Sequence, residues 1–183
     1  MGQKNRIFPD HVYFLTMKVV DWVDVFTRPG YRHIIVEALR YCQQHKGLEL
    51  YAWCLMSNHL HLIAGAQPEK HLSDILRDFK RYTSKAITTA IQRDPESRRQ
   101  WMLHRFAYNA RTDAKSEIYK FWQEGNEAKE LITREFTLQK LHYLHQNPVR
   151  AELVGEAEHY LYSSSSASNY AEQGGLLDVM FLD

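Results

Sequence analysis

The chain has 183 residues, a length that suits one domain with at most an extension, and it carries 23 lysines and arginines against 22 aspartates and glutamates. Hydrophobic residues make up 44% of the chain and charged residues 25%, which excludes a disordered polyampholyte, a collagen-like chain and a disulfide-dense miniprotein. A formal net charge of only +1 argues mildly against a nucleic-acid partner.

The first half of the chain predicts three strands and one helix. Residues 11–22 are rich in valine, tyrosine and phenylalanine, which favours a strand. After Pro29, apolar residues recur at helical spacing, and Gly47 ends the predicted helix. Residues 48–56 and 59–66 predict two further strands, and the short turn between them joins the two as a hairpin.

The second half is less regular. Residues 72–94 predict a long amphipathic helix, and a shorter helix is expected over residues 95–105 because proline favours a helix start. Residues 106–116 resemble a loop, and the aromatic residues 118–125 suggest a fourth strand. A last helix is expected over residues 137–146, ending before an Asn-Pro pair.

This order of elements predicts the fold class. A strand, a helix, a strand hairpin and a second helix match the first elements of a split β-α-β unit. We therefore expect an α+β protein with a ferredoxin-like (RRM-like) antiparallel sheet, helices packed on one face, and the other face available for a site. We place the main domain at residues 1–155 and a C-terminal extension at residues 156–183.

Charge is unevenly distributed along the chain. Residues 1–69 carry a net charge of +1, residues 70–120 carry +6, and residues 121–183 carry −6. The basic middle third is a candidate polyanion-binding face, although a solvated helix surface explains the same charges. The N-terminus lacks the apolar core of a signal peptide, no segment is long enough to span a membrane, and the two cysteines suit a reducing cytoplasm, so we expect a cytoplasmic protein.

Two short motifs carry candidate chemistry. His59 and His61 share one face of a predicted strand, where two imidazoles can bind a single divalent metal, although such a pair is also frequent without any role. Tyr143 and Asn147 lie four residues apart, on one face of a helix. The asparagine offers an oxygen ligand suited to Mg²⁺ or Mn²⁺, and the phenol can attack a metal-polarised phosphoryl group. Imidazole also suits Zn²⁺, so the spacing leaves the metal open.

A resemblance joins the two motifs. AWCLMSNHLHLI, residues 52–63, and HYLHQNPVRAELV, residues 142–154, resemble the two signature blocks of the single-tyrosine HUH transposases. FWQEGN, residues 121–126, and EHYLYSSSSASNY, residues 158–170, follow similar patterns in the REP-associated tyrosine transposases. The resemblance extends over most of the chain.

The resemblance implies a fold and an activity. It implies a ferredoxin-like sheet of the HUH-endonuclease type, which cleaves single-stranded DNA near a hairpin and forms a 5′-phosphotyrosine link in DNA transposition. Mg²⁺ or Mn²⁺ is implied as the cofactor. Carried over by position, His59, His61 and Asn147 are metal ligands and Tyr143 is the nucleophile. Members of the family are monomers or homodimers, so it stays open whether the tyrosine serves its own chain or a partner, and whether the protein is mobile or domesticated.

Several alternatives remain at this point. Tyr82 is a rival nucleophile in the basic helix. A non-catalytic RRM-like nucleic-acid-binding protein derived from a transposase is the alternative function, and a metallohydrolase that uses water in place of tyrosine is a third. The expected phosphate contacts are the basic residues Arg77, Lys80, Arg81, Lys85 and Arg150.

Overall fold

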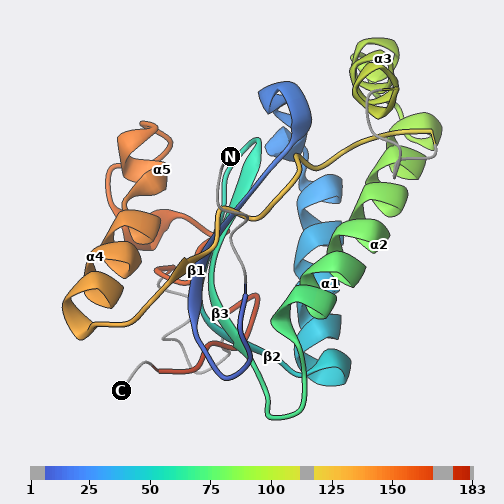
Figure 1. Cartoon of the computed structure of the whole chain (residues 1–183). Coiled ribbons are helices and arrows are strands. Elements are labelled where there is room, and N and C mark those ends of the chain that lie inside the picture. Colours follow the sequence, from blue (N-terminus) through green and yellow to red (C-terminus); the bar gives the residue numbers. More distant parts are fainter. Residues whose placement is uncertain (1–6, 112–117, 167–174, 182–183) are drawn as a thin grey trace.

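The computed structural model of the protein describes residues 7–111, 118–166 and 175–181 (Figure 1). Its strands are β1 (Tyr13–Lys18), β2 (Leu48–Leu55), β3 (His59–Ala66) and β4 (Lys129–Glu130). Its α-helices are α1 (Pro29–Lys46), α2 (Leu72–Arg93), α3 (Arg99–Ala110), α4 (Arg134–His145) and α5 (Asn147–Arg150). Three 3₁₀ turns complete the described elements: η1 (Val20–Trp22), η2 (Val25–Thr27) and η3 (Ala157–His159).

The four strands form one antiparallel sheet in the order β2-β3-β1-β4. This order places β1 and β3 at the centre, as a split β-α-β unit requires, and confirms the predicted ferredoxin-like α+β fold. Helices α1 and α2 cover one face of the sheet, as expected. Helix α4 lies across the opposite face, against β2 and β3, so the face expected to be free carries a helix of its own (Figure 1).

The alternation of β3 decides what each face of the sheet holds. Leu60 and Leu62 are fully buried in the main core, together with Leu76 and Phe79 of α2. Because successive strand side chains point to opposite faces, the histidines between and beside these leucines face α4. A second, smaller cluster lies on that face, between the sheet and α4. Its buried members are Phe14, Ala52, Cys54, Met56, Ile63 and Leu144.

The fourth strand is not where the aromatic segment predicts it. Residues 118–125 contribute a single bridge, from Trp122 to Val19, and the strand itself is the two-residue β4 farther along the chain. Phe121 and Trp122 are both buried, and their rings contact Phe26 from the first connection. The segment therefore inserts two large rings into the core, where a regular strand would have to turn every second side chain away.

Other element boundaries also differ from the sequence prediction. The first strand ends at Lys18 rather than continuing to residue 22, and α3 spans Arg99–Ala110, where a loop was expected from residue 106. Helix α4 begins earlier than expected because the Thr133 hydroxyl accepts a hydrogen bond from Phe136 N at 3.2 Å and caps it. The helical path resumes in α5, because a proline in the first turn of a helix forfeits no intrahelical hydrogen bond.

The segment after α5 returns to the sheet and lies along β2. Leu55 N donates to the Tyr162 carbonyl at 2.9 Å, and Ser164 N donates to the Trp53 carbonyl at 2.8 Å. Farther on, Met180 N donates to the carbonyl of Leu50. The division into residues 1–155 and 156–183 stays a prediction, but the described part of the second segment packs on the same sheet as the first.

Across the described ranges, none of the helices is both long enough and apolar enough to cross a lipid bilayer.

Candidate active site

Two histidines of β3 stand side by side at the centre of the site. The ring centroids of His59 and His61 are 4.7 Å apart, and His61 is only 3% exposed. The Nδ1 atom of His59 lies 2.7 Å from the Asn58 side-chain oxygen, and the Nδ1 atom of His61 lies 3.0 Å from the Thr16 hydroxyl. Both Nδ1 atoms therefore have partners, which leaves the two Nε2 atoms available for a ligand.

The histidines are held in the form that binds metals. Burial lowers the pKa of His59 to about 4, with a further contribution from the charge of Lys18. Burial lowers the pKa of His61 to about 3, and the neighbouring His59 adds to the effect. Both imidazoles are thus neutral at physiological pH. The Nε2 atom of His61 is buried and has no hydrogen-bond partner among the described residues, so a lone pair points into the site unmatched.

Helix α4 brings Tyr143 to these histidines. The centroid of the Tyr143 ring lies 5.7 Å from that of His61 and 6.0 Å from that of Phe14, and both contacts are edge-on. The next residue, Leu144, is fully buried in the small cluster against the sheet and fixes the helix there. Tyr143 itself is 37% exposed, so its ring contacts the site while remaining accessible from solvent. The tyrosine and both histidines belong to the same chain.

Asn147, the first residue of α5, completes the group. Its side-chain nitrogen donates to the carbonyl of Tyr143 at 2.9 Å, and its amide oxygen is left to interact with the two imidazoles. Asn147 raises the pKa of both His59 and His61, as a hydrogen-bond acceptor near the two rings does. The Nε2 atom of His61 nevertheless has no hydrogen-bond partner among the described residues. The structure therefore gathers the four predicted residues His59, His61, Tyr143 and Asn147 in one place.

Cations surround the tyrosine. The Arg150 guanidinium lies over the Tyr143 ring at 5.2 Å from its centroid, and Lys140 Nζ lies 5.6 Å from the same centroid. Lys18 is the strand neighbour of His59 and pairs with Glu127. Arg150 was expected from the sequence, but Lys140 and Lys18 were not. The available signal was the i, i+3 spacing that places Lys140 beside Tyr143 on the helix surface.

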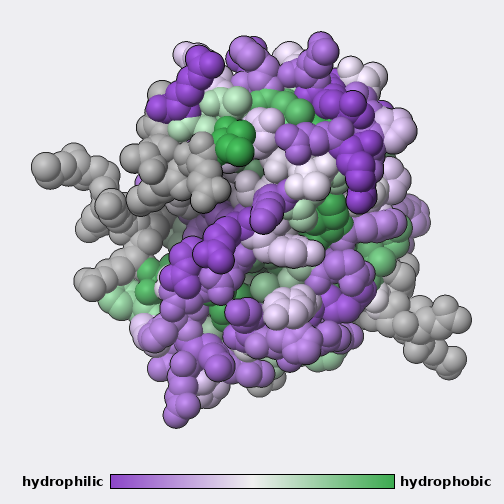
Figure 2. Space-filling view, turned by 90° about the vertical axis from the view of Figure 1, so that its right-hand side faces the viewer, coloured by the Kyte–Doolittle hydropathy of each residue, from purple (hydrophilic) through white to green (hydrophobic). Residues whose placement is uncertain are grey.

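The basic residues of α2 lie elsewhere. Helix α2 packs on the face of the sheet opposite the histidines, and the view of that side of the molecule is largely hydrophilic (Figure 2). Arg77 pairs with Asp74 and Asp78, and Lys80 donates to the carbonyls of two residues in the segment 123–125. Burial lowers the pKa of Lys80 to about 8. Arg81, Lys85 and the rival nucleophile Tyr82 are exposed on the same helix, so none of these five residues joins the site.

The donor set suits a divalent cation of intermediate hardness. Two neutral imidazoles and one amide oxygen offer three ligands and leave further positions for water or a phosphate oxygen. No group of three or more histidine, cysteine, aspartate or glutamate side chains is placed to hold a metal within the described ranges. The unmatched Nε2 atom of His61 is the observation that fits a metal at the histidine pair, with Asn147 as the third ligand.

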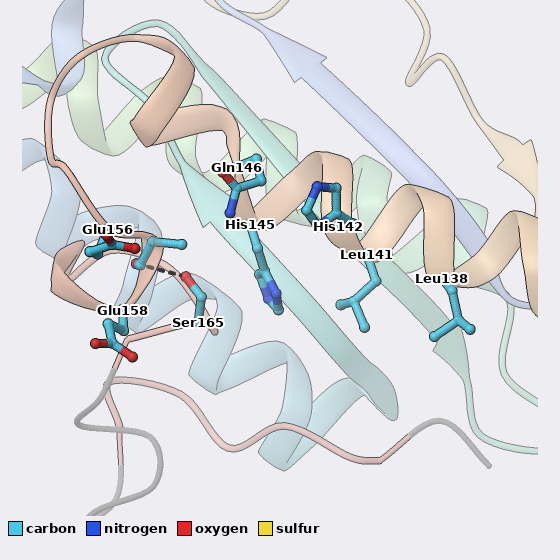
Figure 3. A pocket seen from close by; sticks show the side chains of 9 residues that line it. Leu138, Leu141, His142, His145, Gln146, Glu156, Glu158 and Ser165 are labelled. Atoms are coloured by element: carbon cyan, nitrogen blue, oxygen red, sulfur yellow. Dashed lines mark hydrogen bonds between the residues drawn. The ribbon is translucent and has the colours of Figure 1, made fainter.

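A separate cavity of about 650 Å³ lies on another side of α4 (Figure 3). It is formed between α4 and the segment 156–165, where the Ser165 hydroxyl donates to the carbonyl of Ala157 at 2.9 Å. His142 and His145 line it, together with Glu156 and Glu158. The lining does not include His59, His61, Tyr143 or Asn147, so the cavity is separate from that group.

The chain is similar to proteins of known family. The family model described as "Transposase IS200 like" matches residues 9–118, a stretch that contains the histidine pair. The solved structure of a REP-associated tyrosine transposase bound to a REP hairpin is similar over 100% of this chain and 95% of that one, with a TM-score of 0.63 and 15% sequence identity. A structure of a Deinococcus radiodurans R1 protein, assigned provisionally as a transposase, covers 80% of this chain and 96% of that one, with 15% identity and a TM-score of 0.42.

No curated protein sequence matches the chain. The structural likeness at 15% identity supports the fold, and the family follows from the sequence match, which covers more than half of the chain. The histidine pair, the tyrosine helix and the ferredoxin-like sheet agree with that match. The chain belongs to the IS200-like transposases, the single-tyrosine HUH family that its two motif blocks predict.

Proposed function

We propose that the protein is a divalent-metal-dependent endonuclease and strand transferase that acts on single-stranded DNA through a 5′-phosphotyrosine intermediate. The observation that carries the proposal is the meeting of Tyr143 with the histidine pair of its own chain, at 5.7 Å between the ring centroids of Tyr143 and His61. A metal-binding pair alone suits many reactions, and a tyrosine alone suits none in particular. Together they support transfer of a phosphoryl group to a phenol.

The reaction is a displacement at phosphorus. The Tyr143 oxygen attacks the scissile phosphate and forms a phosphotyrosine ester with the 5′ end of the downstream fragment, while the bond from phosphorus to the 3′ oxygen of the upstream fragment breaks. The phenol proton passes to water, which reaches the partly exposed ring, and the leaving 3′ oxygen takes up a proton from water and becomes a hydroxyl. Because an ester replaces an ester, the freed 3′-hydroxyl can reverse the step or join a different 5′ end.

The surrounding residues bind and orient the phosphate. Arg150 and Lys140 flank the tyrosine ring and are placed to contact the non-bridging oxygens, which holds the phosphorus in line with the phenol. His59, His61 and Asn147 would hold Mg²⁺ or Mn²⁺, and a bound divalent ion supplies neutralisation of the phosphate charge. Phe14 packs against both His61 and Tyr143 and fixes their separation.

The proposed partner is single-stranded DNA that contains a hairpin. The similar tyrosine transposase was solved with a REP hairpin bound, and the two chains match over nearly their whole lengths. The contact of Tyr143 with the histidines of its own chain supports a cleavage step carried out by a single molecule.

Formation of a covalent adduct tests the proposal. A labelled single-stranded hairpin with flanking sequence is incubated with the protein and Mn²⁺, and a denaturing gel is read for a protein–DNA band. We expect the band with the unmodified protein and with Tyr82→Phe, and its loss with Tyr143→Phe. A mobility shift without an adduct would favour the non-catalytic nucleic-acid-binding alternative, and cleavage without an adduct would favour a hydrolase that uses water. An adduct that survives Tyr143→Phe would assign the nucleophile elsewhere.

A further inference from the structure

Trp22 is exposed beside the candidate metal site in an unfavourable backbone conformation. The side chain is 50% exposed, although tryptophan is the largest apolar residue. Its φ angle is +54°, and that of the preceding Asp21 is +52°, so two successive non-glycine residues occupy the left-handed region. Each such residue is rarely tolerated unless the surrounding structure holds it, and such residues concentrate at functional sites.

The surrounding structure does hold this turn. Asn109 of α3 donates to the Asp21 carboxylate at 2.9 Å, and Arg105 Nη1 lies 3.8 Å from the same oxygen. The Asn58 side chain donates to the Trp22 carbonyl at 3.3 Å. The turn is thus fixed from two sides, by α3 and by the hairpin that carries the histidines. These contacts keep the indole at the surface, where packing of the core gains nothing from it.

The indole of Trp22 is in direct contact with residues of the site. Its ring meets that of His59 edge-on, with the centroids 5.9 Å apart, and Lys18 Nζ lies 4.9 Å from its centre. Asn58 connects the two residues a second time, because its oxygen lies 2.7 Å from His59 Nδ1 while its nitrogen donates to the Trp22 carbonyl. A flat apolar ring, a cation and a metal-binding imidazole are therefore neighbours, with Glu127 as the acidic partner of Lys18.

We propose that Trp22 is a stacking platform for an unpaired nucleobase of the DNA strand next to the scissile phosphate, with Lys18 on the adjoining phosphate. This inference rests on the proposed function for the position of the phosphate at the histidine pair. An indole face stacks on any base, but only where the base is not already stacked within a duplex, so the residue would select single-stranded over double-stranded DNA. Stacking also positions the strand, since a base held on Trp22 fixes the nucleotide that reaches the histidines.

Fluorescence tests the contact without requiring any chemistry. The chain has four tryptophans, of which Trp53 and Trp122 are buried and Trp22 and Trp101 are exposed. In a Tyr143→Phe background, single-stranded oligonucleotide should quench the emission of the protein and of Trp101→Phe. The quenching should disappear in Trp22→Phe. Quenching that is lost with Trp101 instead, or kept without Trp22, would overturn the proposal.

Affinity and stability then separate stacking from a structural role. Trp22→Gly removes the ring and relieves the left-handed backbone, so we expect an unchanged or higher melting temperature together with binding of single strands weakened by about 5- to 150-fold. Trp22→Phe should restore part of that affinity, and duplex DNA of the same sequence should bind equally to all three proteins. A variant that melts lower and binds single strands as tightly as before would make Trp22 a purely structural residue.

The two proposals fail in distinguishable ways. Quenching by single strands that depends on Trp22, without any covalent adduct from the unmodified protein, would support the platform and reject the nuclease. An adduct that forms at the same rate and at the same DNA concentration in Trp22→Gly would support the nuclease and reject the platform.

Discussion

Asn58, directly before the histidine pair, and Thr16 of β1 decide which nitrogen of each imidazole is available. Asn58 and Thr16 occupy the Nδ1 atoms of His59 and His61 and leave both Nε2 atoms to a ligand. Groups that orient metal-binding histidines in this way typically change metal affinity by about 10- to 100-fold when they are removed. Thr16 is 7% exposed, so water cannot easily replace its hydroxyl.

We expect Thr16→Val to weaken Mn²⁺ binding by about 10-fold or more, because the His61 ring loses the partner that fixes its orientation. Titration calorimetry on the DNA-free protein measures this directly. Thr16→Ser keeps the hydroxyl and should retain most of the affinity. Thr88→Val is the matched control, since Thr88 is equally buried but bonds only within its own helix. Equal Mn²⁺ affinity in Thr16→Val and Thr88→Val would show that Thr16 does not orient His61 for metal binding.

Some residues of the site could be predicted from the sequence, and others could not because their contacts depend on tertiary structure. Strand alternation alone places His59 and His61 on one face, and helical spacing alone places Tyr143 near Asn147. Thr16 and Trp22 belong to a different strand and its continuation, and their contacts with β3 depend on the register of strand pairing. Register follows from tertiary packing, so a single sequence without structure does not show it.

At the scale of elements, the position of α4 depends on the segment that follows it. The Nε2 atom of His145, two residues after Tyr143, lies 2.8 Å from the Ser164 hydroxyl. That hydroxyl also accepts from Trp53 N at 3.0 Å and lies 3.2 Å from the Trp53 carbonyl. Ser164 thus ties α4 to β2 independently of the apolar contacts of Leu144. Ser164 of the serine-rich run thus helps to hold the tyrosine helix on the sheet.

Ser164→Ala should lower the free energy of unfolding by about 1–2 kcal/mol, because it leaves Trp53 N and His145 without their partner. It should also slow adduct formation at saturating DNA, since α4 is less firmly held. Chemical denaturation and a time course of the covalent band measure the two effects. Ser165→Ala is the control within the same run, because Ser165 bonds Ala157 and Ser163 but not α4. Identical rates in the two variants would separate Ser164 from the positioning of Tyr143.

The elements that the sequence predicted well are those with a strong period. Helices α1 and α2 and the β2-β3 hairpin lie close to the expected ranges, because their apolar residues repeat and glycine or a tight turn ends them. The fourth strand was misplaced because β-forming aromatics also serve as core fillers, and Phe121 and Trp122 do so. Only two residues pair in β4, too few to leave a pattern in the sequence.

At the scale of the whole molecule, positively charged side chains lie on both faces of the sheet. The acidic last third of the chain supplies Lys140 and Arg150 beside Tyr143, whereas the basic middle third lies mostly on the far side of the sheet. The net charge of a segment therefore did not show where its cations gather. If the proposed function holds, the cations at the tyrosine act on the scissile phosphate, and those on α2 act on a more distant part of the DNA.

The triple variant Arg77→Gln, Arg81→Gln and Lys85→Gln separates these two roles. If these residues bind phosphates of a longer DNA, the slope of log affinity against log salt should fall by about 0.7 for each single-strand phosphate that the variant no longer neutralises. The rate of adduct formation at saturating DNA should not change. Lys140→Gln should do the opposite, with a slower rate and a smaller effect on the slope. A triple variant with an unchanged salt slope would mean that the α2 surface does not contact DNA.

The hydrogen bonds between β2 and the C-terminal segment also cover an edge of the sheet. β2 is an outermost strand of the sheet, and without that segment its backbone amides and carbonyls would present an open template for strands of other molecules. A protein cut after residue 155 would keep His59, His61, Tyr143 and Asn147 and still expose that template. The truncated protein is expected to aggregate, because the C-terminal segment normally occupies the hydrogen-bonding edge of β2.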